Sequence, residues 1–337
     1  MKLTLVIILN GLFSILFFLN CLAQVKPVPI SGCTKIFGPI GPEDFALDDE
    51  TNVLFVSSHD RKNFDSIGSI YSMKLTDKIP KLVKLEIEYP KNFRPHGVSI
   101  AKTNQGKKFY VISHRREENI PHSVEVFKIE KETLVHEKTI QDKSFTNPND
   151  LFVFSDGRIL VSNDNGTSIQ FLQFLNLAFL RKTARLTLYK DGKWKELEPA
   201  HVLGNGVHVL LQDNKEIVYL ADTYTGKIFV YELKNDSLEF LRKIELDSGP
   251  DNFTVDENGD LIVAAHKSLF RFLKHQGNKD SFSPSQIFKI KKDYSFEEIY
   301  ANSGEEISAS STGLIYKNNL YITQVFEPFL LSCPLVK

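Results

Sequence analysis

The chain has 337 residues and a formal net charge of −1, and its basic residues are not gathered in any one stretch. This charge pattern gives no sign of a nucleic-acid-binding or anionic-membrane surface and favours a small-molecule partner. The length would ordinarily suggest two domains, but a closed ring of repeats also reaches this size as one domain.

The first 23 residues are typical of a secretory signal peptide. Met1 and Lys2 precede a mostly apolar run over 3–19, and Ala23 provides a small residue at the expected cleavage point. Two alternatives stay open: the run is retained as a hydrophobic anchor, or Cys21 is the lipidated cysteine of a bacterial lipoprotein signal. The sequence predicts an exported chain, which is secreted, or held at a membrane in either alternative.

Six short clusters rich in Asp, Asn and Gly recur about every fifty residues, which is the period of a β-propeller blade. Each one stands immediately before a strand-like apolar segment. The clusters occupy 42–45, 95–98, 148–151, 204–207, 250–253 and 311–314. Further apolar segments follow after polar turns, at 53–57, 108–112, 158–161, 217–220, 260–263 and 320–322. The pattern predicts an all-β fold, a six-bladed β-propeller forming a single domain over 24–337.

The clusters are the candidate functional site. In a propeller the innermost strand of every blade starts at the central channel, so these side chains should converge on one axis. They are nearly all oxygen donors with one imidazole, a set that suits a hard cation and above all calcium. Taken singly, each Asn, Asp or Gly is more often a turn residue than a ligand. Recurrence at one blade position favours the metal site.

One stretch, 168–185, interrupts the β pattern. Its apolar residues follow a helical spacing, it lacks Gly and Pro, and 165–167 provides a helix start. The sequence therefore predicts a short added helix. Its apolar face is wider than a solvated helix needs, which leaves three placements open: a lid over one end of the ring, contact with a membrane or lipid surface, or packing on the side of the propeller.

Two cysteines, Cys33 and Cys333, remain at the ends of the chain if Cys21 leaves with the signal. In an exported chain such a pair favours a disulfide, with two unpaired buried thiols as the alternative. The bond would latch the first and last strands of the ring within one blade. On the chain-entropy model a loop of this length contributes about 5 kcal/mol.

Several motifs resemble those of the paraoxonases, which are calcium-dependent lactonases and arylesterases. The resemblance runs in matching order from Cys33 to Cys333, includes the terminal cysteine pair, and places that family's active-site helix at 168–185. The motifs are Gly41-Pro42-Glu43-Asp44, Pro95-His96-Gly97-Val98-Ser99, Asn149-Asp150-Leu151, Gly204-Asn205-Gly206 and Asp251-Asn252-Phe253-Thr254-Val255.

This resemblance implies two calcium ions on the axis of the ring. A structural ion would be held by Asp44, Asp150 and the backbone carbonyl of Val98. The catalytic ion would be held by Glu43, Asn149, Asn205, Asp251 and Asn252. Two carboxylates and three amides leave room for water and substrate on a six- to eight-coordinate cation. Such an ion would polarise an ester carbonyl and stabilise the oxyanion formed by water attack.

The family's histidine pair maps onto His96 and His114. The resemblance implies that His96 is the general base for the attacking water and that His114 is its partner, while Asp251 is a competing base. Asp164 also matches a family position near the histidines, although a turn role is equally plausible. The segment 261–266 lacks the cysteine found in the family, and Leu203 stands where an aromatic residue is expected, so substrate preference is not transferred.

The predicted function is calcium-dependent hydrolysis of lactones and aryl esters by metal-assisted water attack. Two alternatives stay open. The first is a divergent enzyme on the same scaffold, either a sugar lactonase or a condensing enzyme like strictosidine synthase. The second is a propeller without catalytic activity that keeps calcium for stability and binds a ligand or partner.

Overall fold

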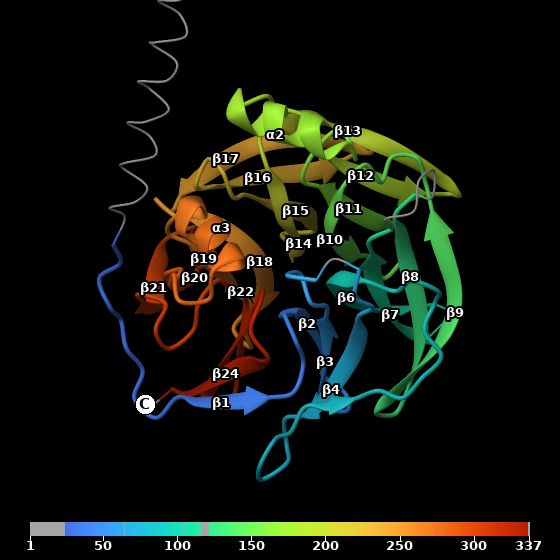
Figure 1. Ribbon diagram of the computed structural model, residues 1–337. Coiled ribbons are helices and arrows are strands. Elements are labelled where there is room, and N and C mark those ends of the chain that lie inside the picture. The colour runs from blue at the N-terminus through green and yellow to red at the C-terminus, as the bar shows by residue number, and fades with distance from the viewer. Residues whose placement is uncertain (1–23, 64, 105, 116–120, 336–337) are drawn as a thin grey trace, which may run out of the picture.

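The computed structural model describes residues 24–63, 65–104, 106–115 and 121–335. The strands in these residues form six four-stranded sheets arranged as a ring (Figure 1). The predicted six-bladed all-β propeller is confirmed. The predicted signal peptide over 1–23 lies outside the described residues. No helix within the described part of the chain is long and apolar enough to cross a membrane.

The first three blades follow the chain without interruption, each running from an innermost to an outermost strand. Blade 1 comprises β2 (Pro42–Asp48), β3 (Val53–Ser58), β4 (Ser69–Lys74) and β5 (Val83–Lys84). Blade 2 comprises β6 (Pro95–Thr103), β7 (Gly106–Ser113), β8 (Ser123–Glu130) and β9 (Thr133–Gln141). Blade 3 comprises β10 (Pro148–Val153), β11 (Ile159–Asn163), β12 (Ala184–Lys190) and β13 (Lys193–His201).

The remaining blades continue the same order, with one exception at the end of the ring. Blade 4 comprises β14 (Gly204–Gln212), β15 (Lys215–Asp222), β16 (Lys227–Lys234) and β17 (Ser237–Glu245). Blade 5 comprises β18 (Gly249–Val255), β19 (Leu261–His266), β20 (Ser285–Ile290) and β21 (Phe296–Asn302). Blade 6 comprises β22 (Ser310–Tyr316), β23 (Asn319–Gln324), β24 (Phe329–Pro334) and, from the other end of the chain, β1 (Thr34–Phe37).

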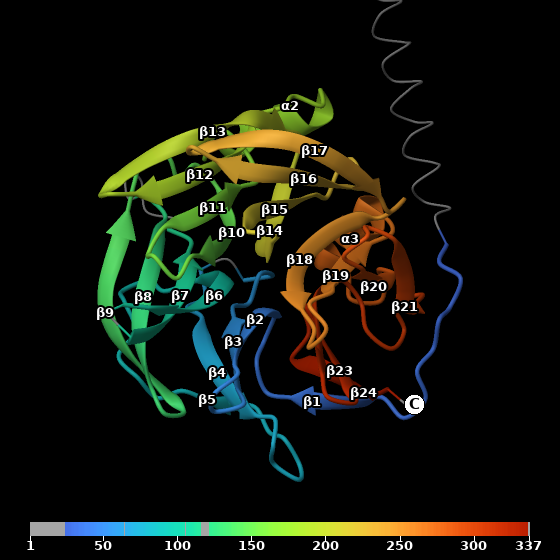
Figure 2. The same ribbon diagram turned by 180° about the vertical axis from the view of Figure 1, so that it is seen from behind.

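Blade 6 therefore closes the ring by joining the two ends of the chain. Strand β1 pairs antiparallel with β24, from Thr34 opposite Ser332 to Phe37 opposite Phe329. The predicted disulfide is present: Cys33 is bonded to Cys333, 300 residues away. Figures 1 and 2 show β1 lying along β24 at the outer edge of this blade.

The hydrophobic core lies between neighbouring blades. Between blades 1 and 2, Phe55 of β3 and Phe109 of β7 are fully buried, and their ring centroids are 5.7 Å apart. Between blades 4 and 5, Tyr219 of β15 packs in one cluster with Val263 of β19. Because every strand face is covered by the next blade, apolar side chains occupy both faces of the middle strands.

Every innermost strand carries a β-bulge at its polar cluster. In blade 1, Pro42 lies opposite Ser58 and Phe45 opposite Val56, so three steps along one strand face two along the other. The same shift occurs at Pro95/Val98, Pro148/Leu151, Gly204/Val207, Pro250/Phe253 and Ser310/Gly313. A bulge kinks the strand locally and re-aims its side chains. The clusters are thus the first residues of strands rather than turns before them.

The sixth cluster begins one residue earlier than predicted, at 310–313 rather than 311–314. The run of Ser and Thr before Gly313 offers no unique residue to fix the register, so the sequence-based prediction places the cluster one residue too late. The predicted helix over 168–185 is present but shorter. It forms α2 (Gln170–Ala178), which ends before Leu180 takes a left-handed φ of 51° and the chain enters β12.

A second helix, α3 (Leu269–Gly277), was not predicted. Its N-cap is Ser268, whose side-chain oxygen accepts a hydrogen bond of 3.2 Å from the backbone N–H of Arg271. The helix lies in the connection between β19 and β20 of blade 5 (Figure 1). Phe272 on this helix packs against Phe326, with ring centroids 5.2 Å apart.

Candidate active site

A cavity of about 1040 Å³ opens at one end of the ring, between the first residues of the innermost strands. Each blade contributes the residue that follows the first residue of its bulge. These six residues, called the first ring here, are Glu43, His96, Asn149, Asn205, Asp251 and Ser311. The first ring therefore contains four of the predicted ligands of the catalytic calcium ion together with His96, the predicted general base. Helices α2 and α3 border the same cavity through Gln173 and Phe272.

The next residue of each bulge forms a second ring, which does not line the cavity. Its members are Asp44, Gly97, Asp150, Gly206, Asn252 and Thr312. The two glycines stand where the backbones of neighbouring blades approach each other closely. A Cβ on Gly97 would lie 2.5 Å from the carbonyl oxygen of Asn149, and a Cβ on Gly206 would lie 2.3 Å from that of Asp251. Only glycine fits at these positions.

Four of the five predicted ligands of the catalytic ion present a buried oxygen that accepts no hydrogen bond. Four buried atoms lack a hydrogen-bond partner: Glu43 Oε2, Asn149 Oδ1, Asn205 Oδ1 and Asn252 Oδ1. A buried acceptor without a donor costs about 1–3 kcal/mol, so four of them around one axis are an expensive arrangement for a protein without a cation. The donor set fits a hard cation such as calcium.

Amide oxygens dominate this set, and carboxylates are few. No group of three or more His, Cys, Asp and Glu side chains within the described residues forms a metal-binding arrangement by itself. The asparagines of blades 3, 4 and 5 therefore have to complete any calcium site. Such mixed carboxylate and amide coordination is ordinary for calcium and poor for zinc.

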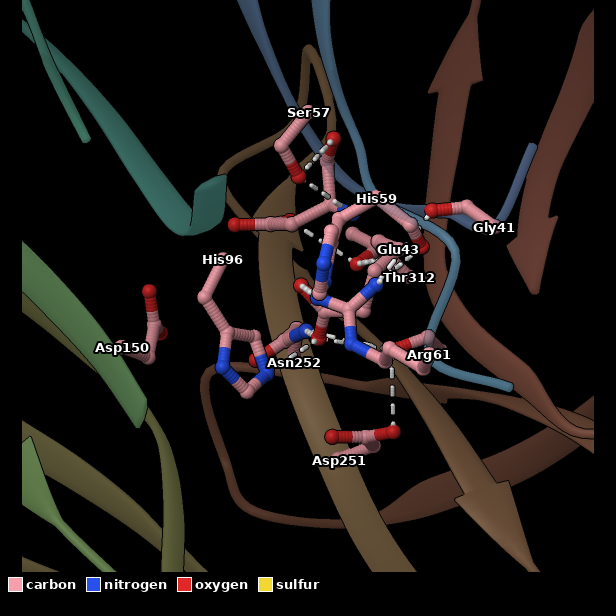
Figure 3. Close-up of polar contacts among 12 residues, drawn as sticks. Gly41, Glu43, Ser57, His59, Arg61, His96, Asp150, Asp251, Asn252 and Thr312 are labelled. Atoms are coloured by element: carbon pink, nitrogen blue, oxygen red, sulfur yellow. Dashed lines mark hydrogen bonds and ion pairs between the residues drawn. The ribbon is translucent and has the colours of Figure 1, made fainter. Parts of the chain in front are cut away.

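Hydrogen bonds hold the two carboxylates of the first ring in place (Figure 3). Ser311 Oγ lies 3.0 Å from both Glu43 Oε1 and Asp251 Oδ2, and Asn252 Nδ2 donates to Glu43 Oε1 at 2.9 Å. His266 Nε2 lies 2.9 Å from Asp251 Oδ2. Burial alone would raise the pKa of Glu43, but His96, Arg61 and the Asn252 hydrogen bond together lower it to about 2.

The predicted ligands of the structural ion, Asp44 and Asp150, join neighbouring blades. Asp44 Oδ2 accepts from the backbone N–H of Val98 at 2.8 Å, and Asp150 Oδ2 accepts from that of Val207 at 2.8 Å. Burial, together with nearby carboxylates that include Glu43, raises the pKa of both well above its usual range. Two buried like charges at the axis are what a second cation would neutralise.

The predicted histidine pair is in contact. His96 Nδ1 lies 2.9 Å from His114 Nε2, and the other nitrogen of His96, Nε2, lies 3.4 Å from Glu43 Oε1. His114 Nε2 also lies 2.8 Å from the carbonyl oxygen of Pro148. Burial, reinforced by the neighbouring His96 and His122, lowers the pKa of His114 well below its ordinary value. His114 is therefore neutral at pH 7.

The proton on His114 decides what His96 can do. A carbonyl oxygen only accepts hydrogen bonds, so the contact with Pro148 favours a proton on His114 Nε2. The same proton then also faces His96 Nδ1, which acts as its acceptor. In that tautomer neutral His96 carries its own proton on Nε2, toward Glu43. In the other tautomer the shared proton belongs to His96 Nδ1, and His96 Nε2 is free to accept one.

A third set of residues, which the sequence analysis did not single out as a set, surrounds the cavity. In each blade, one residue of the second strand pairs with the first residue of the bulge. The members of this set are the residues that come next in the sequence: His59, His114, Asp164, Thr223, His266 and Val325. All except Asp164 line the cavity. The position of His114 in its repeat, carried to the other blades, was the signal that would have found His59 and His266.

Asp164 is held away from the cavity by Asn147, whose amide donates to its Oδ1. Burial raises the pKa of Asp164 to about 6. Leu203, which replaces an expected aromatic residue, does line the cavity. The other apolar lining residues include Leu269 and Phe272 of α3 and Phe326, which packs on Phe272.

Arg61 reaches the first ring from the loop after β3, and no motif pointed to it. Its Nη2 lies 3.5 Å from Glu43 Oε2, while the same guanidinium donates to the carbonyl oxygens of Gly41 and Pro95. Figure 3 shows Arg61 beside Glu43. The arginine partly offsets the charge of a carboxylate that also faces the cavity.

Comparisons with known proteins give matches that cover most of the chain. The family model Arylesterase matches residues 54–335. Human serum paraoxonase/arylesterase 1 is 28% identical and human serum paraoxonase/lactonase 3 is 27% identical, over 93% and 92% of this chain and 91% of each relative. Among solved structures, a luciferin-regenerating enzyme matches with a TM-score of 0.58 at 14% identity, covering 92% of this chain and 95% of its own. A gluconolactonase from Xanthomonas campestris matches with a TM-score of 0.56 at 15% identity, covering 93% of this chain and 96% of its own. These two share the fold.

Proposed function

Since this chain belongs to the arylesterase family, we propose that it is a calcium-dependent hydrolase of lactones and aryl esters. The observation that carries the calcium requirement is the set of four buried oxygens without a hydrogen bond, contributed by four blades. The names of the relatives, arylesterase and lactonase, support the substrate class. The chemistry that a bound calcium ion supplies is Lewis-acid polarisation of the ester carbonyl.

Two ions are proposed, one at the cavity, held by four first-ring residues and Asn252 of the second ring, and one deeper on the axis. The second ion would be held by Asp44, Asp150 and the carbonyl of Val98, because two buried carboxylates there repel each other without a cation. The ion at the cavity would be held by Glu43, Asn149, Asn205, Asp251 and Asn252. Metal analysis of protein dialysed against micromolar calcium should give two ions per chain, and Glu43→Gln should lose one of them first.

His96 is proposed as the general base and His114 as its partner. In this role His96 accepts the proton of the attacking water at Nε2, which requires the tautomer with the shared proton on His96 Nδ1. The other tautomer favours Asp251, whose Oδ2 already accepts from Ser311 and His266. If His96 is the base, His96→Gln should lower kcat/KM by about 100-fold or more. If Asp251 is the base, His96→Gln should keep most of the turnover.

The chain is also proposed to be exported. The leader-like segment over 1–23 and the Cys33–Cys333 disulfide both suit an oxidising compartment. Association with a lipid surface is proposed through α2, in which no residue is buried. Phe171 and Phe174 are 67% and 61% exposed. The protein should sediment with phosphatidylcholine vesicles, and replacing both Phe171 and Phe174 by serine should prevent this.

The deciding experiment measures hydrolysis of a δ-lactone, an acyl-homoserine lactone and phenyl acetate, with calcium and after chelation. Glu43→Gln and His96→Gln are the test variants. His136→Gln is the matched control, because His136 is another partly buried imidazole paired with a glutamate, on the outermost strand of blade 2 and outside the cavity.

We expect turnover that requires calcium, is lost in Glu43→Gln and persists in His136→Gln. Turnover that persists after complete removal of calcium would contradict the metal requirement. Folded, calcium-loaded protein that hydrolyses none of the three substrates would refute the hydrolase and favour a binding propeller or a condensing enzyme.

A further inference from the structure

The walls of the cavity carry more positive than negative side chains. Four permanent cations line it, namely Arg61, Arg94, Arg115 and Lys143, against two carboxylates, Glu43 and Asp251. Two of the cations have carboxylate partners: Arg61 faces Glu43, and Arg115 Nη2 lies 2.8 Å from Glu125, which is itself buried outside the cavity. Any calcium bound to Glu43 and Asp251 would make the cavity more positive still.

Arg94 is the buried cation of this set that has no carboxylate partner among the described residues, whereas Lys143, which also has none there, is exposed. The side chain of Arg94 is buried at 7% exposure, and no carboxylate of the described residues lies within 4 Å. One guanidinium nitrogen, Nη1, donates to the carbonyl oxygen of Asn92 at 3.3 Å, and Nε has no partner. A buried cation that is not paired is costly, so its presence at a cavity wall calls for an anion from outside.

The backbone of Arg94 is fixed beside the proposed catalytic pair. Its N–H donates to Ser113 Oγ at 3.1 Å, and its carbonyl accepts from the N–H of His114 at 3.0 Å. Arg94 is two residues from His96, which places their Cα atoms about 7 Å apart in an extended chain. The burial of His59 and the positive charges of Arg61 and Arg94 lower the pKa of His59 to about 4. The guanidinium groups of Arg61 and Arg94 therefore both lie close enough to His59 to disfavour its protonation.

We infer that Arg94 is a specificity-determining residue whose guanidinium binds a carboxylate group on the substrate. The inference rests on the proposed hydrolase function of the same cavity. The opposite wall is apolar, with Leu269, Phe272 and Phe326. The substrate is thus an amphiphilic ester or lactone: an apolar acyl or aryl part lies on that wall, and a carboxylate lies within a few bonds of the reacting carbonyl. Arginine suits this task because its planar fork matches a carboxylate.

The test compares two aryl acetates of matched shape, 4-acetoxybenzoate and the neutral 4-acetoxybenzamide, with each rate corrected for alkaline hydrolysis. A charge-assisted hydrogen bond predicts that kcat/KM of the wild type favours the carboxylate by about tenfold or more. Arg94→Gln should remove this preference mainly through KM, and Arg94→Lys should restore part of it. Arg242→Gln is the control, because it removes the same charge from an exposed strand position over the ring of Tyr294.

The outcomes separate the inference from the proposed function. Hydrolysis of both acetates without preference, or an equal loss on both in Arg94→Gln, would overturn the inference and leave the hydrolase intact. Absence of any hydrolysis would refute the hydrolase. In that case calorimetric binding of the products to wild type and Arg94→Gln decides: tighter binding of 4-hydroxybenzoate than of 4-hydroxybenzamide, lost in the variant, supports the carboxylate site, and equal binding overturns it.

Discussion

Replacing Gly206 by alanine should damage stability and activity together. The backbone φ of Gly206 is not left-handed, so the effect of a Cβ is purely steric. That Cβ would lie 2.3 Å from the carbonyl oxygen of Asp251 and 2.8 Å from the Cα of Asn252. Both are backbone atoms of β18, which has to move by about 1 Å to restore van der Waals contact. Overpacking of this kind typically costs about 1–3 kcal/mol.

The same shift displaces Asp251 and Asn252, two proposed calcium ligands. A misplacement of about 1 Å at a catalytic site can lower the rate by about 100-fold. We expect Gly206→Ala to lower the melting temperature by about 2–6 °C, to weaken calcium binding and to reduce lactone hydrolysis. Differential scanning fluorimetry and a calcium titration measure the two effects on one preparation.

Gly277→Ala is the matched control, because nothing lies within 4 Å of the position of its Cβ at the end of α3. It should leave the melting temperature and calcium affinity unchanged. A Gly206→Ala protein with wild-type stability and wild-type calcium affinity would refute the reasoning. It would mean that blades 4 and 5 can separate by the required distance without cost.

Three further predictions follow from other parts of the fold. Replacing Cys33 and Cys333 together by serine should lower stability by up to about 5 kcal/mol, as measured by denaturant unfolding, while β1 still pairs with β24 in the native state. Burial lowers the pKa of His201 from 6.5 to about 4, so the unfolded chain binds its proton first and stability should fall by up to about 3 kcal/mol as pH decreases from 6.5 to 4. His201→Gln should flatten that part of the stability profile, and an unchanged slope would show that other groups govern it. Removing calcium with a chelator should lower the melting temperature of the wild type, and by a smaller amount that of Glu43→Gln, since mass action stabilises only a protein that binds the ion.

The fold could be predicted because its signal is repeated six times. Each blade places a polar cluster at the same point before an apolar strand, so an error in one repeat does not disturb the others. Where a repeat lacked distinctive residues, as in the Ser and Thr run before Gly313, the register was wrong by one. Helix α3 was missed because its nine residues are fewer than the stretch over which a helical period is usually recognised in a sequence.

The site was predictable only as far as the repeats reach. The first ring and His114 occupy repeated positions, and the structure brings them to one cavity. Arg61 and Arg94 stand in connections that precede or follow the strands, where no period fixes their direction. Their location depends on how neighbouring blades pack, which a single sequence does not reveal.

The second ring shows how a repetitive fold acquires an unsymmetrical site. A propeller with six equal bulges would place six equal side chains at the axis, which cannot all be buried acids. Here Asp44 and Asp150 alternate with Gly97 and Gly206, and each acid accepts the N–H of Val98 or Val207, the residue after the glycine of the next blade. The glycines allow the blades to approach, and the acids join them. Exchanging Asp150 for glycine should therefore weaken both the contact between blades 3 and 4 and the second metal site, whereas Asp150→Asn, which keeps an acceptor for Val207, should weaken chiefly the metal site.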